Sequence, residues 1–367
     1  TNDDDITHFV KESSLESTRF ISQPKLDGSA LSLEYRKGRL VRGATRGSGD
    51  RGEDVTKNAR KVQNVPHTLG TEVDVHIRGE VVMRKSVFEE KYRDISPNPR
   101  NLAAGALRQK KSDGKGDASD LVFLAYDAKF PSKNNRHPDS QAPPGAPFDS
   151  HILEWLSNTA GVEPAPWVVH NSDTEEASID SLCQETRAWS ASRSTYDFEI
   201  DGLVFKVDDL EKRSLLGMTA HHPRWALAWK FPPEEATSVL LDVDWQTGRT
   251  GTITPVARIA PQRVGGVTVE NTTLHNLGEV QRLDIQIGDR IRIVRRGDVI
   301  PKIEASLGAA TQRDIDGRTH ADGEPFTGTL PQRRRIAPPQ TCPACDGPIE
   351  IDGAFIRCTD CLLYTSP

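Results

Sequence analysis

A hairpin pattern near the N-terminus constrains the fold of this chain more than any other feature. Residues 29–35, Ser-Ala-Leu-Ser-Leu-Glu-Tyr, alternate as a half-buried strand does. Lys37 and Gly38 form a turn signal, and residues 40–45 have the pattern of a returning strand. We therefore expect a rigid β-hairpin that begins directly after Lys25-Leu26-Asp27-Gly28.

Lys25 lies where this hairpin starts, next to the carboxylate of Asp27. An isolated Lys-x-Asp-Gly is more often surface than catalytic, and a nucleophilic lysine needs burial or neighbouring cations that favour the neutral amine. Lys206 and Lys230 lie in two later apolar runs that predict strands, residues 199–207 and 225–231. One such lysine can simply extend to the surface, but two favour phosphate ligands near Lys25.

Two further stretches contain candidate nucleotide contacts. Residues 45–54 hold Arg46 among several glycines, which indicates either a surface loop or a loop whose backbone approaches a nucleotide. Glu80 lies within residues 73–83, which predict a strand that enters a buried sheet. A carboxylate is seldom buried without a partner, so Glu80 either forms an ion pair or contacts a ribose hydroxyl or a metal.

The remaining pattern of the first two thirds alternates helices and strands. We expect helices over residues 3–11, 86–93, 150–160 and 173–193, a core strand over residues 121–127, and a variable surface loop over residues 131–147. Asn101 is expected to cap a short helix, with Arg100 and Arg108 on either side of it.

The pattern changes in residues 239–303, where glycines separate short strands as in a small antiparallel barrel. Basic residues outnumber acidic ones near its end, which indicates either a solvated mixed-charge face or a DNA-binding groove, and the barrel favours the second. Residues 308–340 are polar and are expected to form a linker or insertion. The basic residues are Arg282, Arg290, Arg292, Arg295, Arg296 and Lys302, against Asp284, Asp289 and Asp298.

Four of the five cysteines lie in the last 26 residues. Cys342 and Cys345, then Cys358 and Cys361, form two Cys-x-x-Cys pairs, the spacing of a structural zinc site with four thiolates. Disulfides are the alternative, and they are rare in the cytoplasm. Cys183 stands alone and is expected to be a small buried apolar residue.

Length and charge set the broad class. The chain has 367 residues and a net charge of -6, which favours two or three domains and gives no global signal for nucleic acid. No stretch approaches the ~20 apolar residues of a membrane helix, so a cytoplasmic protein without a membrane contact is expected. The chain opens without methionine, and we expect a fragment.

Together these motifs resemble the bacterial NAD-dependent DNA ligases. The resemblance implies an α+β protein: a nucleotidyltransferase (adenylation) domain with antiparallel sheets and flanking helices over residues 1–233, a β-barrel OB-fold over 234–338, and a partial four-cysteine zinc module over 339–367. The motifs are Lys-Leu-Asp-Gly at 25, Thr-Arg-Gly-x-Gly at 45, Arg-Gly-Glu at 78, Asn-Pro-Arg-Asn-x-Ala-Ala-Gly at 98, Asp-Gly-x-x-x-Lys at 201, Trp-Lys-Phe at 229 and Gly-Arg-Thr-Gly at 248.

By this resemblance Lys25 attacks NAD to form lysyl-AMP, AMP passes to the 5′-phosphate of a nick in double-stranded DNA, and the 3′-hydroxyl displaces it, in replication and repair. Mg²⁺ (or Mn²⁺) and Zn²⁺ are the implied metals, and a monomer is expected. The implied catalytic residues are Lys25, Asp27, Lys206 and Lys230. The implied nucleotide ligands are Gln23, Lys25, Arg46, Glu80, Tyr126, Lys206 and Lys230. The implied DNA ligands are Arg100, Arg108, Arg249, Arg295 and Arg296.

The chain departs from the family pattern in three places. Gln23 replaces a glutamate, and the spacing of Cys361 is atypical, which leaves the fourth metal ligand open. The segment that recognises nicotinamide is expected upstream of Thr1, so the chain should react poorly with NAD yet seal a pre-adenylated nick. The alternatives are an ATP-dependent polynucleotide ligase and a non-catalytic OB/zinc DNA-binding module.

Overall fold

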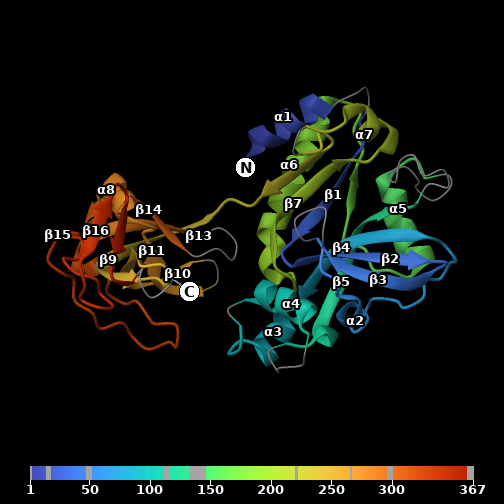
Figure 1. Cartoon of the computed structure of the whole chain (residues 1–367). Helices are drawn as coiled ribbons and strands as arrows, with labels where there is room; N and C mark the ends of the chain where they lie inside the picture. The colour runs from blue at the N-terminus through green and yellow to red at the C-terminus, as the bar shows by residue number, and fades with distance from the viewer. Residues whose placement is uncertain are drawn as a thin grey trace. The chain divides into compact units, whose positions relative to one another are not determined.

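The computed structural model describes residues 2–13, 18–46, 52–96, 98–110, 116–131, 146–219, 222–264, 267–295 and 301–361. The chain divides into two compact units, Thr1–Phe231 and Pro232–Pro367 (Figure 1). The first unit contains two four-stranded sheets and the second is built on a barrel.

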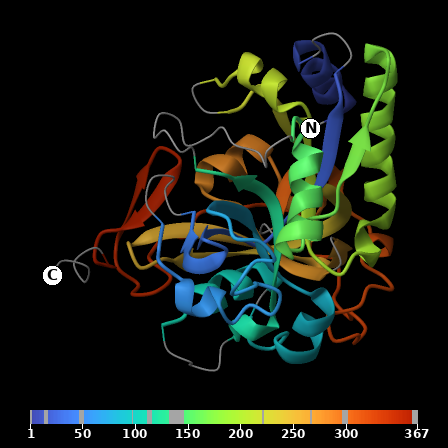
Figure 2. The ribbon, with the colours of Figure 1, turned by 90° about the vertical axis from the view of Figure 1, so that its right-hand side faces the viewer.

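One sheet of the first unit has its antiparallel strands in the order β6-β1-β7-β8. Helices α1 and α6 lie side by side against it (Figures 1 and 2), and their apolar residues form one core with Phe20, Leu203 and Phe205. The strands predicted at residues 199–207 and 225–231 and the helices predicted at residues 3–11 and 173–193 are confirmed. The bounds are α1 Asp3–Ser13, β1 Phe20–Leu26, β6 Val168–His170, α6 Glu175–Ser192, β7 Ile200–Val207 and β8 Ala226–Lys230.

The second sheet has the order β3-β2-β4-β5 and contains the predicted hairpin. Lys37 and Gly38 form its turn with φ angles of 48° and 72°, a backbone conformation that glycine adopts without strain. Helices α2, α4 and α5 pack against this sheet. The bounds are β2 Ser29–Arg36, β3 Arg39–Thr45, α2 Thr56–Ala59, β4 Val75–Met83, α4 Pro99–Arg108, β5 Leu121–Lys129 and α5 Asp149–Trp155.

The cap of α4 differs from the prediction. The N-cap is Asn98, which has an extended backbone and whose side-chain oxygen accepts the N–H of Asn101 at 2.8 Å. Pro99 follows at the first helical position, which suits a residue without an N–H. The prediction that Asn101 caps the helix is therefore wrong, because Asn101 lies inside it.

The other helices of this unit are short. A π-helical turn continues α5 to Ala160, where Gly161 ends it with a φ of 72°, as the sequence predicted. The predicted loop at residues 131–147 lies largely outside the described residues, with only 131, 146 and 147 described. The bounds are α3 Lys85–Lys91, η1 Ala118–Asp120, η2 Leu156–Ala160, η3 Arg193–Thr195 and α7 Leu210–Leu216.

The second unit is the predicted barrel. Its sheet runs β11-β14-β13-β9-β10, and β10 also pairs with β11, so the strands close into a ring around an apolar core. Helix α8 connects β11 to the last two barrel strands through the short strand β12. The bounds are β9 Glu234–Thr247, β10 Thr252–Val264, β11 Val267–Thr273, α8 Leu277–Leu283, β12 Gln286–Ile287, β13 Asp289–Arg295 and β14 Lys302–Ala309.

Residues 308–340 form an insertion held against the barrel, rather than a free linker. Strand β15 (Arg334–Arg335) pairs with β12, and the Nε of Arg333 contacts the fully buried carboxylate of Asp289 at 2.7 Å. A final hairpin extends the barrel sheet through β10. The strands of this hairpin are β16 Ile349–Asp352 and β17 Phe355–Cys358. Within the insertion, a 3₁₀ turn, η4, spans Gln312–Asp314.

Candidate active site

Three adjacent strands bring Lys25 and Lys230 into one row. Lys25 on β1 pairs with Gly202 on β7, and Gly202 pairs with Lys230 on β8. Residues directly opposite in an antiparallel sheet share a face, so both lysine side chains leave the same side of the sheet. A Cβ on Gly202 would lie 2.0 Å from the carbonyl oxygen of Trp229, so only glycine allows β7 and β8 to pair at this position.

We call this side of the sheet the lysine face, made of Gln23, Lys25, Gly202, Lys206 and Lys230. It is opposite the face covered by α1 and α6, because the residues that contact those helices alternate with it. Lys206 also belongs to this face, four residues along β7 from Gly202. A strand rises about 3.3 Å per residue, so the Cα atoms of Lys206 and Gly202 lie about 13 Å apart. Lys206 is therefore not an immediate neighbour of Lys25.

Two of the site residues lie at breaks in strand register. Asp201 is the extra residue between the pairs Lys25–Gly202 and Leu26–Ile200. Tyr126 is the extra residue on β5, where the pairing with β4 shifts between Arg78 and Gly79. A β-bulge turns a side chain away from strict alternation, and bulges occur often beside active sites.

Lys25 is paired with a carboxylate. Its Nζ lies 2.9 Å from each carboxylate oxygen of Asp201, and both side chains are partly exposed. From the sequence we expected cations around Lys25 and gave Asp201 no role. The available signal was the Asp-Gly at 201–202, but the bulge that turns Asp201 toward Lys25 depends on pairing with a strand 176 residues away.

Glu80 on β4 contributes a second acid near Lys25. Burial raises the pKa of Glu80 to about 7, while the positive charge of Lys25 opposes that rise and the charges of Asp27 and Asp201 add to it. Asp27 itself is bound by Arg100, Nη1 to Oδ1 at 3.0 Å. The structure thus brings Glu80, Asp27 and Arg100 together with the lysine.

Tyr126 and Gln23 contribute groups that fit a nucleobase. Burial, followed by the charge of Glu80, raises the pKa of Tyr126 to about 12, so its ring lies near that acid and its phenol stays neutral. Gln23 is buried, and its Nε2 has no hydrogen-bond partner within the part of the chain that the structure describes. A buried amide nitrogen without a partner is costly, and an adenine acceptor would satisfy it. Gln23 and Tyr126 therefore offer a hydrogen-bond donor and an aromatic ring of the kind that a nucleobase requires.

Lys206 is already paired inside the protein. Its Nζ lies 2.5 Å from Oδ2 of Asp149 on α5, and that oxygen also lies 2.8 Å from Nη2 of Arg213 on α7. Asp149 and Arg213 were not identified from the sequence, because Asp149 follows a loop pattern and Arg213 resembles an ordinary surface residue.

The other predicted basic residues have mixed surroundings. Arg46 is exposed, and its charge acts on the pKa of Tyr126. Of the glycines that follow it, Gly47 and Gly49 lie outside the described residues, whereas Gly52 lies within them. Arg108 is 3.5 Å from Glu53. In the second unit Arg249 is exposed and Arg295 is partly buried, whereas Arg296 lies outside the described residues.

Much of the predicted basic surface of the barrel is neutralised. Arg282 binds Glu279, Arg292 lies 3.3 Å from Glu304, and Arg290 lies 3.9 Å from Asp314. This pattern favours the mixed-charge face for these three residues.

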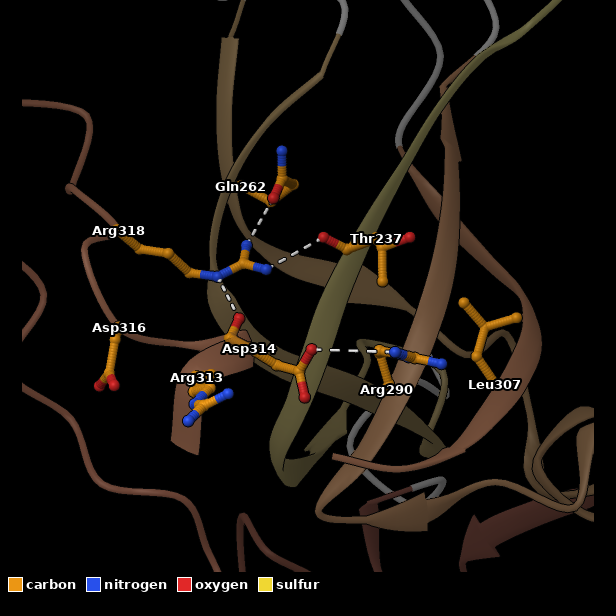
Figure 3. A pocket seen from close by; sticks show the side chains of 8 residues that line it. All are labelled: Thr237, Gln262, Arg290, Leu307, Arg313, Asp314, Asp316 and Arg318. Carbon is orange, nitrogen blue, oxygen red and sulfur yellow. Dashed lines mark hydrogen bonds and ion pairs between the residues drawn. The ribbon is translucent and has the colours of Figure 1, made fainter. Parts of the chain in front are cut away.

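A pocket of about 680 Å³ lies beside Arg290 (Figure 3). In it Arg318 donates to the backbone oxygens of Asp314 and Thr237 and to the side chain of Gln262. Its guanidinium thereby attaches the insertion to the barrel. The pocket is lined by Thr237, Gln262, Arg290, Leu307, Arg313, Asp314, Asp316 and Arg318.

The four terminal cysteines lie together, with their sulfurs within 4.8 Å of one another. Cys345 Sγ is 3.5 Å from both Cys358 Sγ and Cys361 Sγ, and Cys342 Sγ is 3.8 Å from Cys361 Sγ. Zn–S bonds of about 2.3 Å in a tetrahedron place sulfurs about 3.8 Å apart, whereas a disulfide needs about 2.05 Å. The four side chains therefore fit a tetrahedral ion, with Cys361 in the set.

The fold and the lysine face together have the features of a nucleotidyltransferase joined to an OB-fold. Residues 2–234 match the NAD-dependent DNA ligase adenylation domain, and residues 237–314 match the NAD-dependent DNA ligase OB-fold domain. The chain belongs to the NAD-dependent DNA ligase family. The sequence-based expectations of the family and of the α+β fold class are confirmed.

Curated relatives agree with this assignment. A DNA ligase of Psychrobacter arcticus is 38% identical over 356 residues, which cover 94% of this chain and 46% of that protein. A DNA ligase of Alcanivorax borkumensis is 39% identical over 358 residues, which cover 94% of this chain and 41% of that protein. The chain thus spans about half the length of the curated relatives it matches.

A solved structure titled "Pmar-Lig_Pre." has a TM-score of 0.43 and 14% identity, and the match covers 82% of this chain and 66% of that one. The assignment rests on the sequence matches. Within the described ranges, no helix combines the length and the apolar character needed to cross a bilayer.

Proposed function

We propose that this chain carries the catalytic centre of an NAD-dependent DNA ligase that seals nicks in duplex DNA. The observation that carries the proposal is the row Lys25–Gly202–Lys230, with Asp201 in contact with the Nζ of Lys25. The row supports the proposal because Lys25, the candidate nucleophile, and Lys230, the candidate phosphate ligand, lie on one face of one sheet, with Asp201 as a candidate proton acceptor beside Lys25.

In the first step a nitrogen–phosphorus bond forms between Lys25 Nζ and the α-phosphorus of NAD, while the phosphorus–oxygen bond to nicotinamide mononucleotide breaks. The ammonium must first lose a proton, and Asp201 is in hydrogen-bond contact with it at 2.9 Å. AMP then moves to the 5′-phosphate of the nick, and the 3′-hydroxyl displaces it to close the strand. Asp27, held by Arg100, fixes the turn that follows Lys25.

Charge stabilisation dominates phosphoryl transfer, and the lysine face supplies it through Lys230 and Lys206. Asp201 and Glu80 offer carboxylate oxygens of the kind that Mg²⁺ or Mn²⁺ prefers, and such an ion would neutralise phosphate oxygens there. Gln23 and Tyr126 would hold adenine, and Glu80 and Arg46 would lie toward the ribose.

We propose the contacts with DNA from the positive charge of five arginines. Arg100 and Arg108 in the first unit, and Arg249, Arg295 and Arg296 in the second, would bind the backbone without reading sequence. The four cysteines would hold one structural zinc. The proposal includes an adenylation domain over residues 1–233, an OB-fold domain over 234–338 and a zinc module over 339–367. It also includes a monomeric state and a cytoplasmic location.

The test measures covalent AMP and strand sealing together. Wild-type protein and Lys25→Ala are incubated with Mg²⁺ and either NAD or ATP, and intact-mass spectrometry reports the AMP adduct. We expect the wild type to form the adduct poorly with NAD, as the family resemblance implies, and Lys25→Ala to form none, because the nucleophile is gone. An adduct from ATP alone would favour the ATP-dependent class.

A gel assay with pre-adenylated nicked DNA separates the final step, over a series of salt concentrations because backbone contacts weaken with salt. Sealing of this substrate supports the proposal. No sealing at low salt, together with no adduct, would instead support a non-catalytic DNA-binding module.

A further inference from the structure

A buried cluster of three charged residues lies where α5, β7 and α7 meet in the first unit. We call it the Asp149 cluster, made of Asp149, Lys206 and Arg213. One carboxylate oxygen of Asp149 contacts both cations, at 2.5 Å from Lys206 Nζ and 2.8 Å from Arg213 Nη2. The Asp149 side chain is 1% exposed, and those of Lys206 and Arg213 are 10% and 11% exposed.

The backbone holds Asp149 firmly in this place. Its N–H donates to the carbonyl oxygen of Asp208 at 2.8 Å, and the preceding Phe148 forms a β-bridge with Asp209. Arg213 is fixed as well, because its Nε donates to Val207 O at 2.5 Å. These contacts fix the backbone of Asp149 and the side chain of Arg213, and the carboxylate of Asp149 lies directly against Lys206.

The charges of the cluster leave a surplus. Lys206 and Arg213 carry two positive charges and Asp149 one negative charge, so one positive charge is uncompensated within the cluster. Burial works against an ionised carboxylate, yet the two cations hold the pKa of Asp149 below its usual range. Asp149 thus stays charged beside Lys206 at neutral pH.

We propose that Asp149 is a positioning residue for Lys206. Asp149 holds the Lys206 ammonium on the lysine face, and the ammonium then contacts both Asp149 and the nucleotide phosphate. Arg213 supplies a second positive charge beside the Asp149 carboxylate. This inference rests on the proposed function, since it requires Lys206 to bind a phosphate. Lys206 Nζ also donates to the carbonyl oxygen of Tyr126 at 3.3 Å, so its ammonium is aimed toward β5 before any nucleotide arrives.

The inference predicts a change in pH dependence that a purely structural residue would not cause. The groups that face Lys206 are Asp149 on α5, Arg213 on α7, and Tyr126 O and Asp127 on β5. Asp149→Asn removes the counter-charge of a buried ammonium and leaves Arg213 beside it. The charged form of the Lys206 side chain is then less favourable, because the opposite charge beside it is gone and the cation of Arg213 remains nearby.

The assay is sealing of pre-adenylated nicked DNA at saturating DNA, because that step does not use Lys25 as a nucleophile. Rates are measured from about pH 6 to about pH 11, because the pKa of an ordinary lysine is about 10.4 and the series must include the alkaline limb of the profile. For Asp149→Asn we expect that limb to move to lower pH by about one unit or more, the effect of one opposite charge at this distance. We also expect a maximal rate about tenfold to 100-fold lower, since a misplaced phosphate ligand costs this much.

Arg213→Gln provides a second variant with the opposite sign. It removes a cation next to Lys206, so the alkaline limb should move to higher pH. This variant keeps the inference testable if Asp149→Asn does not fold.

Asp208→Asn is the matched control. Asp208 is fully buried and directly follows β7, the strand that carries Lys206, but its carboxylate binds Ser150 and Arg19 rather than Lys206. We expect Asp208→Asn to lower the thermal midpoint without moving the alkaline limb.

The outcomes distinguish the proposed function from the role of Asp149. If wild-type protein does not seal pre-adenylated DNA, the proposed function fails and this inference fails with it. If wild-type protein seals but neither Asp149→Asn nor Arg213→Gln moves the alkaline limb, only the inference is overturned. Equal shifts in Asp149→Asn and Asp208→Asn would also overturn it, because the effect would then be a general loss of structure.

Discussion

Replacing Gly202 with alanine tests whether the row Lys25–Gly202–Lys230 acts as a unit. The new Cβ would lie 2.0 Å from Trp229 O and 2.8 Å from Lys230 Cα. Non-bonded heavy atoms pack at about 3.5 Å or more, so β8 must move away from β7 by about 1 to 1.5 Å. Because Lys230 is carried on β8, its ammonium moves with the strand.

The expected cost follows from that displacement. Forced overpacking of a sheet interior destabilises by about 1–3 kcal/mol. A displacement of about 1 Å in a group that positions the reaction lowers the rate by about 100-fold. We therefore expect Gly202→Ala to remain folded at moderate temperature and to transfer AMP about 100-fold more slowly than the wild type.

The assay is single-turnover transfer of AMP to nicked DNA, followed on a gel, with urea unfolding measured in parallel. Gly105→Ala is the control, because Gly105 is exposed in α4 and a Cβ there meets nothing within 4 Å. Alanine should stabilise this helix by about 0.5–1 kcal/mol and leave the rate unchanged. A wild-type rate in folded Gly202→Ala would refute the reasoning, since the row would then tolerate a shifted Lys230.

Individual groups of the site and of the cysteine cluster give three further predictions. Lys206→Ala and Lys230→Ala should each slow AMP transfer by about 100-fold or more, the loss expected for one preorganised charge-stabilising group; single-turnover rates near the wild type would exclude them as phosphate ligands. Elemental analysis of protein purified without chelator should give one zinc per chain, and Cys361→Ser should lower that content if Cys361 is the fourth ligand. The pKa of Glu80 is raised to about 7 in the folded state, so Glu80 ionises first in the unfolded state as the pH rises. This difference lowers the free energy of unfolding between about pH 4.5 and pH 7, by an amount on the order of 3 kcal/mol. Urea unfolding of Glu80→Gln should therefore show a gain in stability over the wild type at pH 8 and little gain at pH 4.5; a gain of equal size at both pH values would contradict the assignment.

The elements with strong local signals were predictable. Alternation in residues 29–45 indicated the hairpin, and the lysines in apolar runs indicated the strands that carry Lys206 and Lys230. The cysteine spacing indicated the cluster at the C-terminal end. In each case the information lies within about 20 consecutive residues, so local periodicity and motif spacing are enough to reveal it.

The partners of the lysines were not predictable in the same way. Asp201 reaches Lys25 through a bulge in the pairing of β1 with β7, and register between distant strands is not encoded in either strand alone. Asp149 reaches Lys206 because the first residue of α5, Asp149, is hydrogen-bonded through its N–H to the carbonyl oxygen of Asp208, which follows β7. The sequence predicts a cap of α4 at Asn101, but Asn98 is the residue with the extended backbone of an N-cap, and this backbone geometry is visible only in the structure.

These two acids would explain how the proposed site keeps its cations ready for a phosphate. An unpaired buried ammonium is costly, so a site that binds phosphate must compensate its lysines while it is empty. Lys25 is compensated by Asp201, and Lys206 by Asp149. The two pairs differ in exposure, since the Lys25 side chain is 32% exposed and that of Lys206 10% exposed. The partly exposed pair Lys25–Asp201 can separate at low cost, which suits a nucleophile that must lose its proton and move. The buried pair Lys206–Asp149 holds its cation in place, which suits a ligand that must not move during the reaction.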